Sequence, residues 1–199
     1  MTDKKPQVHL RMVGCRLNQS EIDSMARQFE AQGYTVTDDA SAATLHVVNT
    51  CAVTQQATRS SRKLIRDLHK ANPDADITVT GCYAHISPDE IAVIDGVARI
   101  VDNRAKDSLV EQLTGGKLAL FDAEPVSRET RIGRTRAFVK VQDGCDNACT
   151  FCVTTIARGE GRSRHAADIV REIRTLHERD GYQEAVLTGV HLGSYGHDL

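Results

Sequence analysis

The chain has 199 residues, of which 40% are hydrophobic and 26% charged, and its formal net charge is −2. This composition suits a globular protein of one or two domains with real apolar cores. The mildly acidic balance argues against bulk electrostatic binding of nucleic acid, so any such contact has to come from local basic patches. No stretch has the length of a transmembrane helix, and the start of the chain lacks the apolar region of a secretory signal. We therefore expect no membrane partner and a cytoplasmic location.

Strand-like and helix-like segments alternate through the first part of the chain. The expected strands are 8–13, 45–49, 77–80 and 98–101. The expected helices are 18–32, 58–71, 88–94 and 106–113. The first of these helices is predicted from apolar residues at helical spacing, and Gly33 is expected to end it. The alternation predicts an α/β fold with a parallel sheet and helices on its faces.

The periodicity fades between residues 114 and 136, where glycines, a proline and scattered arginines indicate a linker. We therefore divide the chain into a first domain at 1–114, a linker at 115–136 and a second domain at 137–199. The second domain begins with a strand at 137–141, a helix at 166–179 and a strand at 184–188. Two strands cannot close a parallel barrel, so we expect the sequence to be a fragment of a longer protein.

Three cysteines fall in one short segment with the spacing Cys-x₃-Cys-x₂-Cys: Cys145, Cys149 and Cys152, here called the loop cysteines. Three thiolates can hold three irons of a cubane cluster and leave the fourth iron without a protein ligand, whereas ordinary electron-transfer clusters take four cysteines. An open metal position can bind a substrate or cofactor. The alternatives are a structural zinc site or three buried cysteines. Zinc would need a fourth ligand, and the nearest candidate, His165, lies outside any paired Cys/His spacing.

The other three cysteines each follow a predicted parallel strand: Cys15, Cys51 and Cys82, here called the sheet-edge cysteines. Ligands of open α/β sheets gather outside the carboxyl ends of the strands. If the strands are neighbours, the three thiols converge on one point. Glycine before Cys15 and Cys82 would let the backbone approach a cluster closely. The alternative is three small buried residues. Outside secreted proteins, six cysteines that divide into two groups of three favour metal ligands over disulfides.

These segments together resemble the methylthiotransferases, radical S-adenosylmethionine enzymes that insert a methylthio group at an unactivated C–H bond. The loop cysteines at their spacing are typical of radical S-adenosylmethionine enzymes. Further matching segments surround the sheet-edge cysteines or follow the loop: 14–18, 49–54, 79–84, 142–152, 157–159, 162–164 and 187–190. The resemblance implies an N-terminal parallel-sheet domain with one 4Fe–4S cluster, followed by the incomplete start of a radical S-adenosylmethionine (β/α) partial barrel with another.

The resemblance also implies the roles of the two cysteine groups. The loop cysteines would hold the cluster that binds S-adenosylmethionine, and the sheet-edge cysteines would hold the cluster that carries the sulfur to be inserted. Phe151 would pack on the adenine of the cofactor, with an aromatic core residue as the alternative. Gly189 would let the backbone approach the amino group of the cofactor, with a plain turn glycine as the alternative.

Within the family, segments 49–54, 59–66 and 80–84 look most like the enzymes that act on N6-threonylcarbamoyladenosine beside the tRNA anticodon. The expected partners are tRNA and a reducing protein that donates electrons. The alternatives are a methylthiotransferase acting on isopentenyladenosine in tRNA or on a ribosomal protein, and a non-catalytic iron–sulfur module. One departure is that segment 153–156 stands where the family usually has a proline. With most of the barrel missing, we expect this chain alone to be inactive.

One predicted helix carries a concentration of positive charge. Its cations fall at helical spacing on one face: Arg59, Arg62, Lys63, Arg66 and Lys70. This row could grip the phosphates of an RNA stem. The alternative is a solvated helix face.

Overall fold

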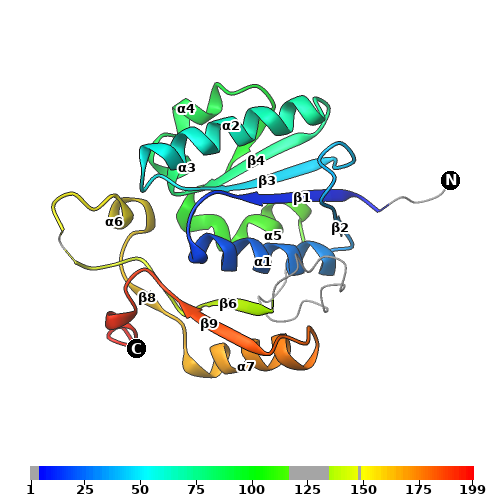
Figure 1. Ribbon diagram of the computed structural model, residues 1–199. Coiled ribbons are helices and arrows are strands. Elements are labelled where there is room, and N and C mark those ends of the chain that lie inside the picture. Colours follow the sequence, from blue (N-terminus) through cyan, green and yellow to red (C-terminus); the bar gives the residue numbers. More distant parts are fainter. Residues whose placement is uncertain (1–4, 117–134, 148) are drawn as a thin grey trace.

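The computed structural model describes residues 5–116, 135–147 and 149–199. Its main feature is a five-stranded, wholly parallel sheet in the order β2-β1-β3-β4-β5 (Figure 1). The strands are β1 (Gln7–Met12), β2 (Thr35–Val36), β3 (Leu45–Thr50), β4 (Asp76–Gly81) and β5 (Val97–Ile100). Because β1 lies inside the sheet, the chain winds outward in both directions from the gap between β1 and β3. Such a reversal of strand order is where open α/β sheets place their ligands.

Helices cover both faces of this sheet (Figure 1). They are α1 (Arg16–Ala31), α2 (Gln55–Ala71), α3 (Cys82–Ile86), α4 (Pro88–Ala92), the 3-10 helix η1 (Asn103–Ser108) and α5 (Leu109–Thr114). Residues of β1, α1 and α5 form one apolar core, around Phe29 and Val47. Residues of β4, α2 and α4 form the other core, around Ile65 and Ile77. Alternate residues of β3 face opposite cores, since Val47 belongs to the first and Val48 to the second.

The second part of the chain is a β-α-β unit with a small hairpin. Strand β6 (Arg136–Lys140) pairs in parallel with β9 (Glu184–Thr188), and helix α7 (Ala166–Glu178) connects them. Short strands β7 (Gln142–Asp143) and β8 (Arg162–Ser163) pair antiparallel. Helix α6 (Val153–Arg158) follows the loop cysteines, and the short 3-10 helix η3 (Leu192–Ser194) follows β9. A third core, around Val139 and Ile169, lies between α7 and the two parallel strands.

The predicted parallel α/β sheet is confirmed, and both ends of each predicted strand lie within one residue of the observed ends. The helix expected at 106–113 starts earlier, as η1, because the Asp102 side chain accepts a hydrogen bond from the Arg104 N–H and begins the turn. The helix expected at 58–71 likewise begins three residues earlier, where the Thr54 hydroxyl caps the N–H of Ala57. Most of the expected linker, 117–134, lies outside the described residues, and Arg136, assigned to that linker, is the first residue of β6.

The two parts of the chain pack together through α1, which lies with α5 between the large sheet and the β6–β9 pair (Figure 1). The Ser20 hydroxyl of α1 accepts a hydrogen bond from the Lys140 N–H at 3.0 Å. Farther along α1, Arg27 forms an ion pair of 3.0 Å with Glu172 of α7, and both side chains are largely buried. The two proposed domains therefore contact each other through buried polar and charged side chains. In the described residues, no helix is long and apolar enough to cross a membrane.

Candidate functional site

The sheet-edge cysteines follow β1, β3 and β4 at their carboxyl ends, at and beside the reversal of strand order. Cys15 is exposed, whereas Cys51 and Cys82 are buried. The backbone at Gly14, between β1 and α1, passes so close to Cys51 that a Cβ atom at position 14 would lie 2.8 Å from the Cys51 Cβ. The sequence-predicted arrangement at one sheet edge is thus present in the fold, and Cys15 and Cys51 flank the point where ligands of such sheets bind.

The glycines before Cys15 and Cys82 allow neighbouring segments of the chain to approach closely, whereas their expected approach to a cluster stays a prediction. Gly81 has a φ of +98°, and a Cβ atom there would lie 2.3 Å from the Thr50 carbonyl oxygen. Gly14 has a φ of +132° and faces Asn18 and Cys51. Both glycines therefore permit close approach of the neighbouring β3 segment, in a backbone conformation that other residues rarely adopt.

Two cations lie near enough to the sheet-edge cysteines to influence them. Burial raises the pKa of the Cys82 thiol, and the positive charges of Arg158 and Lys106 oppose that rise. The neighbouring Cys51 thiol acts in the same direction as burial. Because a thiolate is the form that binds metal, Arg158 and Lys106 favour the form of Cys82 that could act as a ligand.

The loop cysteines lie in a segment that is anchored at both ends. Cys145 is buried, and its N–H donates to the Gly159 carbonyl at 3.0 Å. At the other end, Cys152 is the N-cap of α6, and hydrogen bonds from the Thr155 and Thr154 N–H groups lower the pKa of the thiol of this half-buried residue. Cys149 is exposed, and residue 148 lies outside the described part. A low-pKa, accessible cysteine at a helix N-terminus is suited to metal ligation.

The two cysteine groups fit an iron–sulfur cluster in their donor chemistry. Each group supplies three thiols, from separate strand ends or from one loop; the pKa of Cys152 is lowered, whereas burial keeps the pKa of Cys82 raised despite Arg158 and Lys106. However, among the residues that the structure describes, no three histidine, cysteine, aspartate or glutamate side chains are arranged as a metal site. Ligation by either group therefore remains a proposal.

The two remaining predicted site residues lie on different parts of the second unit. The Phe151 side chain is 92% exposed and is not packed in a core; with Cys149 and Cys152 it lines one shallow pocket. Gly189 follows β9, and a Cβ atom there would lie 2.9 Å from the Leu192 side chain and 3.1 Å from that of Gln142. Gly189 thus lies in a crowded turn, so a larger residue would displace the segment around Gln142.

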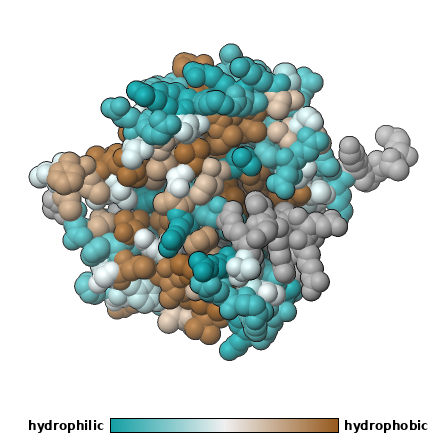
Figure 2. All heavy atoms as spheres, viewed as in Figure 1, coloured by the Kyte–Doolittle hydropathy of each residue, from teal (hydrophilic) through white to brown (hydrophobic). Residues whose placement is uncertain are grey.

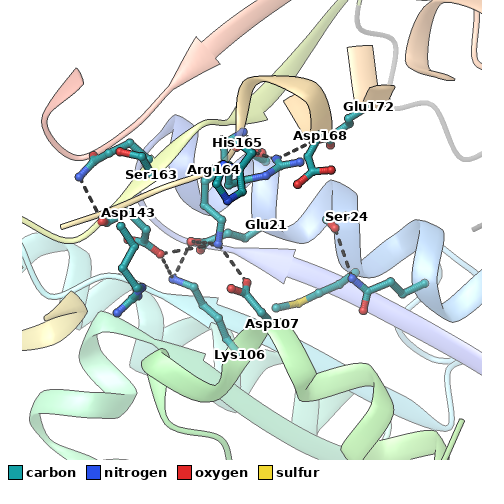
Figure 3. A pocket seen from close by; sticks show the side chains of 16 residues that line it. Glu21, Ser24, Lys106, Asp107, Asp143, Ser163, Arg164, His165, Asp168 and Glu172 are labelled. Atoms are coloured by element: carbon teal, nitrogen blue, oxygen red, sulfur yellow. Dashed lines mark hydrogen bonds and ion pairs between the residues drawn. The ribbon is translucent and has the colours of Figure 1, made fainter. Parts of the chain in front are cut away.

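Sequence reasoning missed a set of charged residues at the interface between the two parts. It consists of Glu21, Lys106, Lys140, Asp143 and Arg158, here called the interface network. Glu21 accepts from Lys106 at 2.6 Å and from Arg158 at 2.9 Å, and Asp143 accepts from Arg158 at 2.8 Å (Figure 3 shows the surroundings). Lys140 also pairs with the exposed Asp107 at 3.0 Å. The network joins α1 and η1 of the first part to β7 and α6 of the second.

The ionic state of this network follows from its charges. Burial alone would raise the pKa of Glu21, but Lys106, Arg158 and Lys140 outweigh burial and hold it at about 2. In the same way, burial opposes ionisation of Asp143, and the same three cations lower its pKa overall. Both carboxylates are therefore ionised at neutral pH. A cavity of about 330 Å³ adjoins the network, with residues of α1, β8 and α7 also in its lining (Figure 3).

One residue links this network to the sheet-edge cysteines. Asn18, which is buried, accepts a hydrogen bond from Arg158 at 2.9 Å and lies 3.5 Å from the Cys15 Sγ. Its amide nitrogen donates to the Val13 and Thr50 carbonyls, next to the Cys15 and Cys51 segments. Asn18, Asp143 and Arg158 fall in segments that carried the family resemblance, whereas Glu21 and Lys106 gave no local signal in the sequence.

Comparison with known proteins finds matches to two protein families along the chain. Residues 7–102 match the uncharacterized protein family UPF0004, and residues 139–196 match the radical SAM superfamily. The threonylcarbamoyladenosine tRNA methylthiotransferases of Bacillus subtilis and Thermotoga maritima are each 36% identical over 96% of this chain. The tRNA-2-methylthio-N(6)-dimethylallyladenosine synthase of Staphylococcus haemolyticus is 30% identical over 96% of the chain.

The alignments cover 45%, 46% and 40% of these three relatives, so the chain spans about half their length or somewhat less. The β6–α7–β9 unit lies within the match to the radical SAM superfamily, which confirms that the second part is the partial start of that fold. With two matched families in the expected order and this identity to named relatives, the chain belongs to the methylthiotransferase family of radical S-adenosylmethionine proteins.

Proposed function

We propose that this chain is part of a tRNA methylthiotransferase that adds a methylthio group to C2 of N6-threonylcarbamoyladenosine beside the anticodon. The main support is the pair of cysteine groups on a chain 36% identical to enzymes named for that nucleoside. The identity to the dimethylallyladenosine synthase is lower, at 30%, and makes that nucleoside the second candidate. A reducing protein would supply electrons. The first domain would comprise residues 1–114, the linker 115–136 and the second domain 137–199.

In this proposal, the cysteine groups hold two 4Fe–4S clusters. The loop cysteines would bind the cluster that takes S-adenosylmethionine, and the sheet-edge cysteines would bind the second. With S-adenosylmethionine, such a cluster supplies radical chemistry able to remove hydrogen from an unactivated carbon. Phe151 is exposed beside the loop cysteines and would provide an apolar surface for the adenine of the cofactor. Gly189 would bring backbone close to the amino group of that cofactor.

The contribution of the chain itself is to position these groups and control their charge. Arg158 lies six residues after Cys152, at the end of α6, and its guanidinium donates to Asn18 beside Cys15. Arg158 and Lys106 favour ionised Cys82, and the N–H groups of α6 favour ionised Cys152. At Cys82 these charges would reduce the cost of deprotonation on cluster binding, and at Cys152 the N–H groups lower the pKa of the free thiol. A non-catalytic iron–sulfur module would not need two sites of three ligands.

The experiment is nucleoside mass spectrometry of tRNA from cells that lack the gene for the full-length protein. We expect the methylthio derivative of N6-threonylcarbamoyladenosine to disappear, with its unmodified precursor accumulating instead. Complementation with the wild-type gene should restore the derivative, and a gene with Cys145, Cys149 and Cys152 changed to alanine should not. Loss of the methylthio derivative of isopentenyladenosine instead would support the second candidate. Unchanged tRNA would contradict both.

A further inference from the structure

Helix α2 carries exposed cations that the fold does not explain. Arg59, Lys63, Arg66 and Lys70 are exposed and follow one another at intervals of four, three and four residues, which places them on one helix face. We call them the α2 basic row. The opposite face of α2 is buried against the sheet. Figure 2 shows a hydrophilic surface over α2 at the top of the view.

The row works against the stability of its own helix. Arg59 and Lys63 are like charges four residues apart, as are Arg66 and Lys70, and each such pair costs about 0.2 to 0.5 kcal/mol. The first turn contains no acidic residue, although an acid there would interact favourably with the helix dipole. The one acid on the helix, Asp67, pairs with Lys63 at 2.5 Å in an exposed contact of small value. Apart from Lys70, which lies in the last turn where the helix dipole favours a cation, folding does not account for the row.

Three members of the row are electrostatically available. Arg59, Arg66 and Lys70 form no ion pair with any residue in the described parts of the chain. By contrast, the nearby Arg62 is held by Glu90 at 2.9 Å and by the Tyr83 hydroxyl at 3.2 Å. From its first to its last member, the row is about 16 Å long at the helical rise of 1.5 Å per residue. A row of this length can face several consecutive phosphates of one strand.

The row begins at the edge of the sheet that carries the proposed cluster ligands. Cys51 directly follows the carboxyl end of β3, and α2 starts four residues later, at Gln55. The Thr54 hydroxyl caps the helix by accepting from the Ala57 N–H at 3.1 Å, which fixes its first turn beside that edge. A strand bound along the row would therefore be positioned beside the sheet-edge cysteines.

We propose that the α2 basic row binds the phosphate backbone of the RNA substrate. This inference rests on the proposed function, which makes RNA the partner. The chain as a whole is acidic, so RNA must be attracted by a local surface, and this row is such a surface. The row itself contains no aromatic side chain on which a base could stack, so its contacts position the RNA without reading sequence. A membrane is disfavoured because the apolar face of α2 is already buried in the protein.

The test is salt-dependent binding of a synthetic anticodon stem-loop RNA, measured by fluorescence anisotropy on this chain. The variant is R59A/R66A/K70A, which leaves the pairs of Arg62 and Lys63 intact and places alanine, the best helix former, in α2. Each phosphate contact contributes about 0.7 to 0.9 to the slope of log K against log salt. We therefore expect the slope to flatten by about two to three units, and equally for a stem-loop of scrambled sequence.

A matched control removes three positive charges elsewhere. The control variant R99A/R171A/R174A changes exposed arginines of β5 and α7, and it should keep the wild-type slope. An unchanged slope in the row variant, equal flattening in the control, or no RNA binding by the wild-type chain at low salt would overturn the proposal. So would row-dependent binding to phosphatidylserine vesicles without RNA binding. Modified tRNA in cells together with row-independent RNA binding would overturn this inference alone and leave the proposed function standing.

Discussion

Removing the Arg158 side chain should destabilise the protein more than removing any exposed charged side chain does. The guanidinium donates to Glu21 at 2.9 Å, to Asp143 at 2.8 Å and to Asn18 at 2.9 Å, and it is 3% exposed. In Arg158→Met, an apolar chain of similar length replaces it, and two buried carboxylates lose one of the three cations that they share, while Lys106 and Lys140 remain. Breaking a buried ion pair by removing one member costs about 3 to 5 kcal/mol. That is a large part of the 5 to 15 kcal/mol that typically stabilises a protein.

The assay is urea unfolding followed by far-UV circular dichroism. At a typical dependence of about 1 to 3 kcal/mol per molar urea, the midpoint should fall by about 1 to 5 M. The matched control is Arg136→Ala, which breaks an ion pair with Glu184 in which both side chains are more than half exposed. Such a pair contributes about 0 to 1 kcal/mol. If Arg158→Met unfolds at the same urea concentration as Arg136→Ala, the interface network does not hold the two parts together as argued.

Three further predictions follow from the same structure. The pKa of Glu21 is lowered to about 2 from 4.5, so its contribution to stability is present above about pH 4.5 and is lost as the pH falls toward 2. Glu21→Gln should therefore lose less unfolding free energy between pH 6 and pH 3 than the wild type does. An identical loss would contradict the assignment. Anaerobically reconstituted protein should bind about eight irons in two 4Fe–4S clusters, and alanine at all three loop cysteines should leave about half, whereas zinc in their place would exclude the cluster interpretation. Gly81→Ala should destabilise the protein by at least about 1 to 3 kcal/mol, because the new Cβ would meet Thr50 backbone atoms at 2.3 and 2.5 Å. Gly33→Ala, at a similar φ but with no atom within 4 Å, should destabilise it less. Equal urea midpoints for the two variants would show that Thr50 moves aside without cost.

The features that could be predicted from sequence are those with a local signal. The parallel sheet followed from strand and helix periods, and the placing of the sheet-edge cysteines followed from a general property of parallel strands, whose carboxyl ends share one edge. The spacing of the loop cysteines indicated their segment directly. Helix α3 was missed because it starts at Cys82, directly after β4, with five residues and no apolar period of its own.

The interface network could not be predicted because its members are distant in the chain. Glu21 and Arg158 are 137 residues apart, and each looks like an ordinary charged residue of a helix. Their burial depends on how α1 packs on the second part, which neither local sequence determines. Asn18 carried a weak signal through the family resemblance, but its contacts with Arg158 and Cys15 are visible only in three dimensions.

The most direct test of the central claim is the reaction itself, performed anaerobically with the full-length protein. The reactants are tRNA that carries N6-threonylcarbamoyladenosine, a reductant, a sulfur source and S-adenosylmethionine with a deuterated methyl group. Mass spectrometry of the digested tRNA should show that nucleoside with one labelled methylthio group in place of one hydrogen. Cleavage of S-adenosylmethionine with no labelled methylthio group in any tRNA nucleoside would contradict the assignment of this chain to a tRNA methylthiotransferase.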